Sequence, residues 1–236
     1  MKKFVAIFKN KDIVSRIVFT IAIFAIIRVG AQLVVPGATT SSSFRDAMND
    51  ASAFSLMNML GGGALQNFSV FALGVSPYIT SQIIIQLLSK DVLPALTELS
   101  KQGEQGRKKT EMATRYLTLM LGAVQAYGII KTMENSEYIT LAGSNFWTYA
   151  YIIVVLLAGS MLEMWLGDQI TSKGLGNGIS MIIFAGIVIN LPSQISNAFT
   201  RWVLVNAKHG NVQLVRGIFQ FALYIFVLLL IVLSST

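Results

Sequence analysis

The chain has 236 residues, of which 54% are hydrophobic and 12% charged, and its formal net charge is +7. Ordinary soluble domains carry about twice that share of charged residues, and the mean hydropathy of +0.64 also excludes a typical soluble domain. There is no cysteine, which excludes disulfides, thiolate metal sites and a cysteine nucleophile. Together these values predict an all-α polytopic membrane protein.

Six windows have the apolar character of a membrane span, which needs about 20 mostly apolar residues. We predict spans at 16–35, 68–88, 113–130, 147–167, 179–195 and 213–234. In the N-terminal segment, in the connections and at the edges of the spans, twelve Lys and Arg residues fall on one side and four on the other. Cytoplasmic loops carry the Lys/Arg excess, so we expect a cytoplasmic N-terminus. We also expect no cleavable signal peptide, because the first apolar run lacks a small-residue cleavage site.

The first predicted span contains Arg28, which follows the apolar run IVFTIAIFAII and precedes Pro36. A charge within a membrane segment is a functional candidate. A long basic side chain near the end of a span also reaches the interface by snorkelling. The residues leave both alternatives open, and we assign Arg28 no chemical role.

Residues 53–65, AFSLMNMLGGGAL, follow a polar, loop-like stretch at 37–52. As a helix, the apolar portion would rise only about 18 Å, which is too short to cross about 30 Å of hydrocarbon. The glycines at 61–63 end it. The segment either lies on the surface or re-enters the protein beside a watery cavity. The residues alone slightly favour the interfacial helix.

The second predicted span places Pro77 near its middle, where a proline bends a helix. Val75, Ile79, Gln82 and Gln86 fall on one stripe at helical spacing. That stripe is aliphatic toward the outer half and carries amides toward the cytoplasm. It suits a tight apolar constriction that opens into a hydrated vestibule. The alternative is a glutamine pair that hydrogen-bonds to neighbouring helices.

The connection between the second and third spans ends in the basic cluster Arg107, Lys108 and Lys109. Such a cluster anchors to anionic lipid or docks a cytosolic partner. Taken alone, it is explained by the positive-inside pattern.

No constellation of catalytic residues is present in the sequence, and we expect no enzyme activity, cofactor or metal site. Glu163 lies near the cytoplasmic end of the fourth predicted span, and we expect a solvated carboxylate there rather than a proton relay. The glycine-rich run at 172–180 lacks the GxxxxGK[ST] order of a phosphate loop and predicts a compact turn. The single histidine, His209, has no second histidine for a metal site.

Five strings, in order along nearly the whole chain, resemble the SecY family of protein-conducting channels. They are IIRVGAQLVVPG, FSLMNMLGGGAL, NFSVFALGVSPYITSQIIIQLL, KQGEQGRKKTEMATRYLTL and DQITSKGLGNGISMIIFAGIVINLP. Their number, length and spacing make the resemblance highly specific. It implies ten spanning helices in two inverted halves, with an hourglass pore between them.

On this resemblance the chain supplies the first inverted half of a SecY-type channel and its sixth span. The implied divisions are a cytoplasmic N-terminus at 1–15, the first half at 16–195 with a re-entrant plug at 53–63, an external connection at 196–212 and the sixth span at 213–236. The short apolar helix is then re-entrant rather than interfacial. The remaining helices would lie beyond Thr236, as in a fragment of a longer channel.

The resemblance also implies roles for individual residues. The aliphatic pore ring is matched by Val75, Ile79 and Ile183. The plug is matched by Phe54, Leu56, Met57, Met59, Leu60, Gly61, Gly62 and Gly63. The lateral gate is matched by Pro77, Thr80, Gln82, Gln86 and Gln125. Contact with a cytoplasmic partner is matched by Arg107, Lys108 and Lys109.

The implied function is passive conduction of unfolded secretory polypeptide across the membrane and lateral release of membrane helices into it. Val and Ile suit the ring because they offer no hydrogen bonds to ions and seal by dewetting. The alternative is a secondary transporter with a substrate site at the broken helix. That class should show an intramembrane charge, whereas the stripe beside Pro77 is uncharged.

The family further implies a bacterial plasma membrane and a set of partners. These are the SecE and SecG subunits, the SecA ATPase, the ribosome with its nascent chain, signal sequences and membrane lipid, with ribosomal RNA contact through the cytoplasmic loops. Energy would come from SecA or from protein synthesis. Two residues depart from the family pattern: Val75 stands where isoleucine is usual, and Glu163 where an apolar residue is usual.

Overall fold

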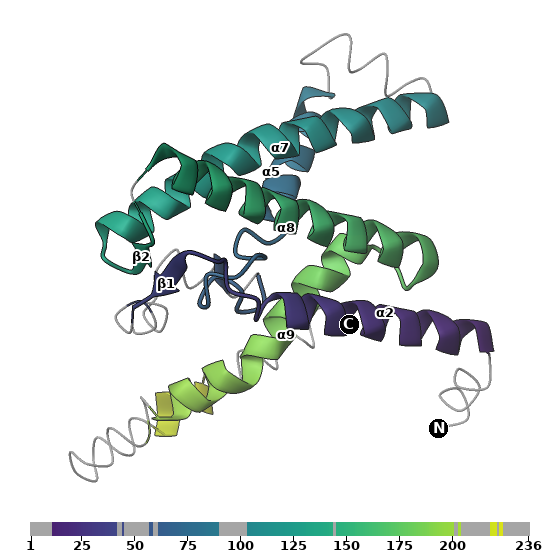
Figure 1. Ribbon diagram of the computed structural model, residues 1–236. Coiled ribbons are helices and arrows are strands. Elements are labelled where there is room, and N and C mark those ends of the chain that lie inside the picture. The colour runs from purple at the N-terminus through teal and green to yellow at the C-terminus, as the bar shows by residue number, and fades with distance from the viewer. Residues whose placement is uncertain are drawn as a thin grey trace. The chain divides into compact units, whose positions relative to one another are not determined.

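Five helices make up most of the described structure (Figure 1): α2 (Lys11–Gly30), α5 (Ser76–Leu88), α7 (Glu104–Asn135), α8 (Phe146–Lys173) and α9 (Gly178–Phe199). The computed structural model describes residues 11–41, 44, 57–58, 61–89, 103–143, 145–200, 203, 218–220 and 222–223. The chain divides into two compact units, residues 1–187 and residues 188–236. The predicted sixth span lies mostly outside the described residues.

The helix α2 is apolar in its central part, carries charged residues near both ends, and packs against α8. Its last residue is Gly30, where an added Cβ would overlap the ring of Phe71. The sequence predicts a span that continues to residue 35. Instead, the chain leaves the helix after Gly30 and pairs with a later segment, through a bridge between Val34 and Ser69. Close packing at Gly30 and this pairing explain the earlier end.

The segment 61–75 is a series of turns, and we call it the irregular segment. The prediction that a helix begins at residue 68 is therefore wrong, since α5 begins at Ser76. Phe68 and Gly74 have positive φ angles of 45° and 58°, which a right-handed helix does not accommodate. Pro77 does not bend the middle of a helix but lies in its first turn, where the missing N–H has no helical partner to lose.

The irregular segment is buried although it is not helical. The side chains of Leu65, Phe68 and Ser69 are inaccessible to solvent. Its backbone hydrogen-bonds outside itself: the Val70 N–H donates to the Leu33 carbonyl at 2.9 Å, and the Val35 N–H donates to Phe68 at 3.1 Å. Non-helical backbone at membrane depth is tolerated where protein surrounds it and satisfies its polar groups, and this segment meets that condition.

A small antiparallel sheet, which the sequence did not predict, is an exception to the all-α prediction. Strand β1 (Ala38–Thr40) pairs with β2 (Ile139–Leu141), with Thr39 opposite Thr140. Next to it, the rings of Phe44 and Tyr138 lie 5.4 Å apart. The sheet ties the chain after α2 to the α7–α8 connection. Strands of three residues are too short to leave a period-two pattern in a polar stretch.

The main apolar core lies between the irregular segment, α7 and α8. Its largest fully buried members include Phe68 of the irregular segment, Ile130 and Met133 of α7, and Ile152 and Leu156 of α8. Antiparallel helices α7 and α8 each contribute a buried stripe to it. The irregular segment is thus fixed by packing from two sides rather than by its own helical bonds.

The connection between α8 and α9 is the compact turn that the sequence predicts at 172–180. Gly176 has a φ of +62°, and the Gly178 N–H donates to Thr171 Oγ1 at 2.8 Å. An added Cβ at Gly178 would overlap the carbonyl oxygen of Gly167. Gly176 thus supplies the positive φ of the turn, and Gly178 allows the close backbone approach.

Two of the described helices, Lys11–Gly30 and Phe146–Lys173, have both the length and the hydropathy of a membrane span. A shorter apolar helix covers Gly178–Pro192. The helix of the predicted second span is too short to cross a membrane, because α5 has 13 residues and rises only about 20 Å. The third predicted span is the central part of α7, whose ends carry charged residues.

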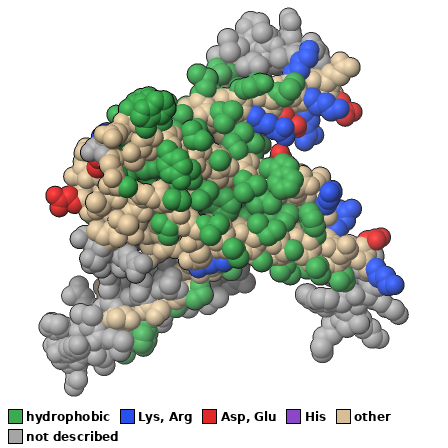
Figure 2. All heavy atoms as spheres, in the orientation of Figure 1, with side chains coloured by type: hydrophobic (Ala, Val, Ile, Leu, Met, Phe, Trp, Pro, Cys, Tyr) green, Lys and Arg blue, Asp and Glu red, His purple; other side chains and the backbone are tan. Residues whose placement is uncertain are grey.

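Large apolar side chains cover much of the face shown in Figure 2. Over the described residues as a whole, exposed large apolar side chains include Val18 on α2, Val124 on α7 and Val154 on α8. In the same view Lys and Arg side chains gather mainly at the end where α2 and α7 begin. A hydrogen bond from Arg16 Nη1 to the Gly174 carbonyl, at 3.3 Å, shows that α8 ends there too. An apolar belt beside a basic end is the pattern expected of a membrane protein.

A polar cluster joins the end of α7 to the start of α8, away from the basic end. Lys131 Nζ donates to Glu134 Oε2 at 3.0 Å and to the Tyr149 hydroxyl at 2.8 Å, and that hydroxyl donates to Glu134 Oε2 at 2.6 Å. The bond from Tyr149, and then that from Lys131, hold the pKa of Glu134 below its usual value. The bonds with Tyr149 and Glu134 raise the pKa of Lys131.

We expect Tyr149→Phe to lower the melting temperature at pH 7 by about 2 °C. The lowered Glu134 pKa means stability that is present above the ordinary carboxyl pKa and lost as the pH falls through the lowered value. The raised Lys131 pKa gives stability that is lost only in strong alkali. The difference in melting temperature between wild type and variant should therefore shrink in acid.

Thermal unfolding at pH 7 and pH 3 measures this difference. The control is Tyr151→Phe, which changes an exposed tyrosine on α8. A difference equal at both pH values would contradict the prediction.

Candidate functional site

The three predicted pore-ring residues lie in one apolar cluster. Val75 is 4% exposed and belongs to its buried part, while Ile79 and Ile183 are partly buried and pack against it. The other buried members are Ile23, Leu166, Ile170 and Ile182. The structure thus brings together residues that are more than a hundred positions apart in the sequence. Whether they form a pore ring stays a prediction.

The start of α5 is held by contacts to α7 and α8. The Ser160 hydroxyl of α8 donates to the Gly74 carbonyl at 2.9 Å. Pro77, which is fully buried, lies against Gly122 of α7, where an added Cβ would be 3.6 Å from the proline Cβ. These contacts fix Val75, the residue that precedes α5, against the apolar cluster.

A cavity of about 1160 Å³ lies beside that cluster, between α5, α7, α8 and the start of α9. Its lining residues are Tyr78, Gln82, Ile85, Gln86, Ser89, Gly103, Arg107, Thr110, Glu111, Thr114, Arg115, Trp165, Asp168, Gln169, Thr171, Ser172, Asn177 and Ile179. Gln82 and Gln86 therefore face this space, as the hydrated-vestibule interpretation of their stripe requires, and not only neighbouring helices.

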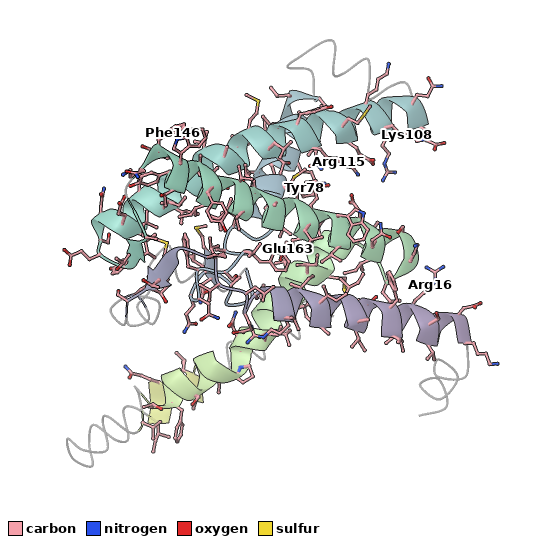
Figure 3. All side chains as sticks on the ribbon, in the orientation of Figure 1. Arg16, Tyr78, Lys108, Arg115, Phe146 and Glu163 are labelled. Carbon is pink, nitrogen blue, oxygen red and sulfur yellow. The ribbon has the colours of Figure 1, made fainter. Side chains whose placement is uncertain are left out.

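Two ion pairs line the cavity. Arg115 Nη2 of α7 lies 2.9 Å from Asp168 Oδ2 of α8, and Arg107 Nε lies 3.3 Å from Glu111 Oε1 within α7. Both pairs are well exposed, so their contribution to stability is small. Figure 3 shows Arg115 close to Tyr78, which reaches the same space from α5. Most of the lining residues are of polar types, and the two arginines are balanced by the two carboxylates, which suits water or a passing chain better than one charged ligand.

Sequence reasoning missed the pairing of Arg115 with Asp168. Each stands within a few residues of the cytoplasmic end of a predicted span, on consecutive spans that must be antiparallel. Opposite charges at matching depth on such helices were the available signal. The sequence did not give their rotation about the helix axes, which decides whether they meet.

The predicted gate residues are only partly brought together. Thr80 donates its hydroxyl hydrogen bond to the Ser76 carbonyl at 3.1 Å, within α5. Gln125 on α7 is partly buried but is not part of the cavity lining. Pro77, Gln82 and Gln86 all lie on α5. The predicted gate residues therefore lie on two helices, α5 and α7, which pack against each other.

The basic cluster occupies the exposed first turns of α7. Lys108 Nζ lies 3.3 Å from Glu104 Oε1, and Arg107 pairs with Glu111. Lys109 is exposed as well. Of the three, Arg107 lines the cavity. Their exposure leaves them accessible to a partner or to lipid headgroups.

The predicted plug is described at Met57, Asn58 and the three glycines at 61–63, while Phe54, Leu56, Met59 and Leu60 lie outside the described residues. The Gly61 N–H donates to the Met57 carbonyl at 2.9 Å, and the Gly63 N–H donates to Asn58 at 2.8 Å. Gly62 has a φ of +64°. This combination is the left-handed glycine ending of a helix, so the glycines end a helical turn as the sequence indicates.

The prediction that Glu163 is solvated is wrong. Its side chain is 2% exposed, and among the described residues its Oε2 has no hydrogen-bond partner. The helix α8 continues for ten residues to Lys173, about 15 Å further, so Glu163 is well inside it. Figure 3 shows it between α8 and α2. Oε2 lies 3.8 Å from the position of a Cβ added at Gly74.

Within the described residues, no group of three or more His, Cys, Asp or Glu side chains is arranged to hold a metal ion. The predicted external residue His209 lies outside them. The expectation of no metal and no cofactor stays a prediction.

Apolar helices, a buried irregular segment and a cavity next to an aliphatic cluster are the features expected of a helical membrane protein. The sequence model of the SecY family matches residues 69–236. The chain belongs to the SecY family. This assignment gives no support to the secondary-transporter alternative.

Curated relatives align with nearly the whole chain. This chain is 43% identical over 234 residues to a Mycoplasma capricolum protein, with 96% of this chain and 48% of that protein aligned. It is 44% identical over 230 residues to one from Streptococcus gordonii, covering 97% and 52%, and 43% identical over 227 residues to one from Bacillus subtilis, covering 94% and 51%. Each is named protein translocase subunit SecY. The chain spans about half the length of these relatives.

Two solved structures share the fold. "The structure of a protein conducting channel" aligns with a TM-score of 0.56 at 16% identity, covering 81% of this chain and 38% of that one. Sec61 in the canine ribosome-channel complex from the endoplasmic reticulum aligns with a TM-score of 0.52 at 17% identity, with the same coverage. At such identities the likeness shows the fold.

Proposed function

We propose that the chain forms one half of a protein-conducting channel, which passes unfolded polypeptide across the membrane and releases membrane helices into it. The observation that carries the proposal is the order of the surfaces along α5 and the residue that precedes it. Val75 and Ile79 lie in the aliphatic cluster, and Gln82 and Gln86 line the polar cavity. A hydrated chamber that leads to an apolar constriction is the arrangement a passive conduit for a flexible chain needs.

The chemistry of the two surfaces fits an unselective polymer substrate. Val and Ile side chains form no hydrogen bonds with side chains or ions and exclude water when they close together. Amides and exposed ion pairs exchange hydrogen bonds with any backbone. Neither surface discriminates between amino-acid side chains, so sequence does not limit what passes.

The remaining assignments complete the proposal. Residues 53–63 act as a plug below the ring, and α5 and α7 form one wall of a lateral gate with Pro77, Thr80 and Gln125. The basic cluster at the start of α7 receives SecA or a ribosome. SecE and SecG accompany the channel in a bacterial plasma membrane. The basic end that α2, α7 and α8 share supports a cytoplasmic N-terminus.

Site-specific photocrosslinking from position 79 tests the conduit. In a full-length channel that contains this sequence, a secretory chain stalled in transit should crosslink to a photoreactive residue at Ile79. The control is Val154 on α8, whose side chain is 63% exposed on the apolar surface and should crosslink to lipid instead. Equal capture of the stalled chain at both positions, or capture only at 154, would overturn the proposed path.

A further inference from the structure

Arg28 contacts the glycine-rich end of the predicted plug. It lies in the last turn of α2, and its Nη1 donates a hydrogen bond of 2.8 Å to the carbonyl oxygen of Gly62. Gly62 is the left-handed residue that ends the turn at Met57 and Asn58. Carbonyls at a helix C-terminus carry partial negative charge, so a guanidinium is a suitable partner for this oxygen.

The glycine segment, residues 61–63, has further neighbours among the described residues. A Cβ added at Gly62 would lie 3.5 Å from the Gly186 Cα, and one added at Gly74 would lie 3.6 Å from the Gly61 Cα. These distances show that the backbones of Gly186 and Gly74 pass close to the segment. Asn58 Oδ1 accepts a bond of 2.8 Å from the Gln66 N–H, but this bond lies within the same stretch of chain. The bond from Arg28 instead ties the segment to a spanning helix.

We propose that Arg28 is a positioning residue that holds the plug closed by anchoring its glycine end to α2. The inference rests on the proposed function, because it assigns to residues 53–63 the role of a plug. Movement of these residues away from the ring would pull Gly62 from Arg28 and break the bond. The anchor therefore favours the closed state by the free energy of one charge-assisted hydrogen bond.

The test compares Arg28→Gln with Arg16→Gln in the full-length channel reconstituted in planar bilayers without substrate. Arg16 is a matched control, since it lies on the same helix and also donates to a glycine carbonyl, that of Gly174. Loss of a charge-assisted bond at an exposed site should raise the open probability of Arg28→Gln about threefold to tenfold. Arg16→Gln should conduct like wild type, and Arg28→Lys, which keeps a cationic donor, should fall between.

The same substitution in a channel that lacks residues 53–63 separates this inference from the proposed function. There Gly62 is absent, so Arg28→Gln should add nothing to the leak that the deletion causes. A further increase in that background would show that Arg28 acts through α2 itself and would overturn the proposal. If the deletion leaks while Arg28→Gln is silent, the plug stands and the anchor is wrong.

If the deletion does not leak, residues 53–63 are not a plug, and both ideas fail. Should Arg28→Gln not accumulate in the membrane, Arg28→Lys alone, measured with and without residues 53–63, gives the same comparison. An elevated open probability confined to the channel that contains the glycine segment supports the anchor. An identical increase in both backgrounds contradicts it.

Discussion

Ile79→Asn should open the channel and relax its dependence on a correct signal sequence. Ile79 packs against the buried cluster that contains Val75, Leu166 and Ile182. An amide at this position attracts water into a constriction that closes by excluding it, and burying an unpaired amide costs about 1–3 kcal/mol. The closed state loses that free energy relative to the hydrated state, which shifts the ratio of open to closed channels by about tenfold.

Export of a reporter with a defective signal sequence measures the effect of Ile79→Asn. The matched control is Ile79→Leu, which conserves volume and apolar character and should export like wild type. Both variants must be normally expressed for the comparison to count. Wild-type export by Ile79→Asn would show that Ile79 does not line the constriction.

Gly159→Ala should disrupt the packing of α8 on the irregular segment. An added Cβ at Gly159 would overlap the carbonyl oxygen of Val70 and lie 2.7 Å from its carbonyl carbon. Because the obstacle is backbone, it cannot be relieved by a change of rotamer. The Ser160 bond to the Gly74 carbonyl would be displaced with it. We expect a loss of about 1–3 kcal/mol of stability, as for other overpacked sites.

Gly128→Ala is the control for Gly159→Ala. Gly128 lies within α7, and nothing lies within 4 Å of an added Cβ, so alanine there should stabilise the helix by about 1 kcal/mol. Thermal unfolding in detergent and protease sensitivity of the irregular segment measure both variants. A Gly159→Ala protein that melts at the wild-type temperature would mean that α8 and the irregular segment separate more easily than their contact indicates.

Hydropathy predicted the helices α2, α7, α8 and α9 but not the irregular segment. A window of apolar residues has the same mean hydropathy whether it is helical or turned. What distinguishes residues 61–75 is the positive φ at Phe68 and Gly74 and the partner carbonyl at Leu33. A positive φ at a phenylalanine has no sequence signature, and the partner lies more than thirty residues away. Only tertiary packing supplies this information.

The candidate site was partly predictable for a similar reason. The periodicity of α5 separated the aliphatic pair Val75 and Ile79 from the amide pair Gln82 and Gln86, and the structure places these pairs on different surfaces. Periodicity describes one helix at a time. The burial of Glu163 and the contact between Arg28 and Gly62 depend on which neighbour covers each residue, and a single helix does not encode that.

The burial of the irregular segment has a consequence for how the membrane acquires this protein. With its preceding turns, α5 is not a segment that lipid can accept by itself, because 13 helical residues span about 20 Å and the turns leave backbone groups that hydrocarbon cannot satisfy. Their hydrogen-bond partners and cover come from the chain after α2 and from α7 and α8. We therefore expect this region to stay in a sheltered, hydrated setting during biogenesis until α8 has been synthesised. On this expectation, the nascent chain depends on an insertion machine for its own α5 region.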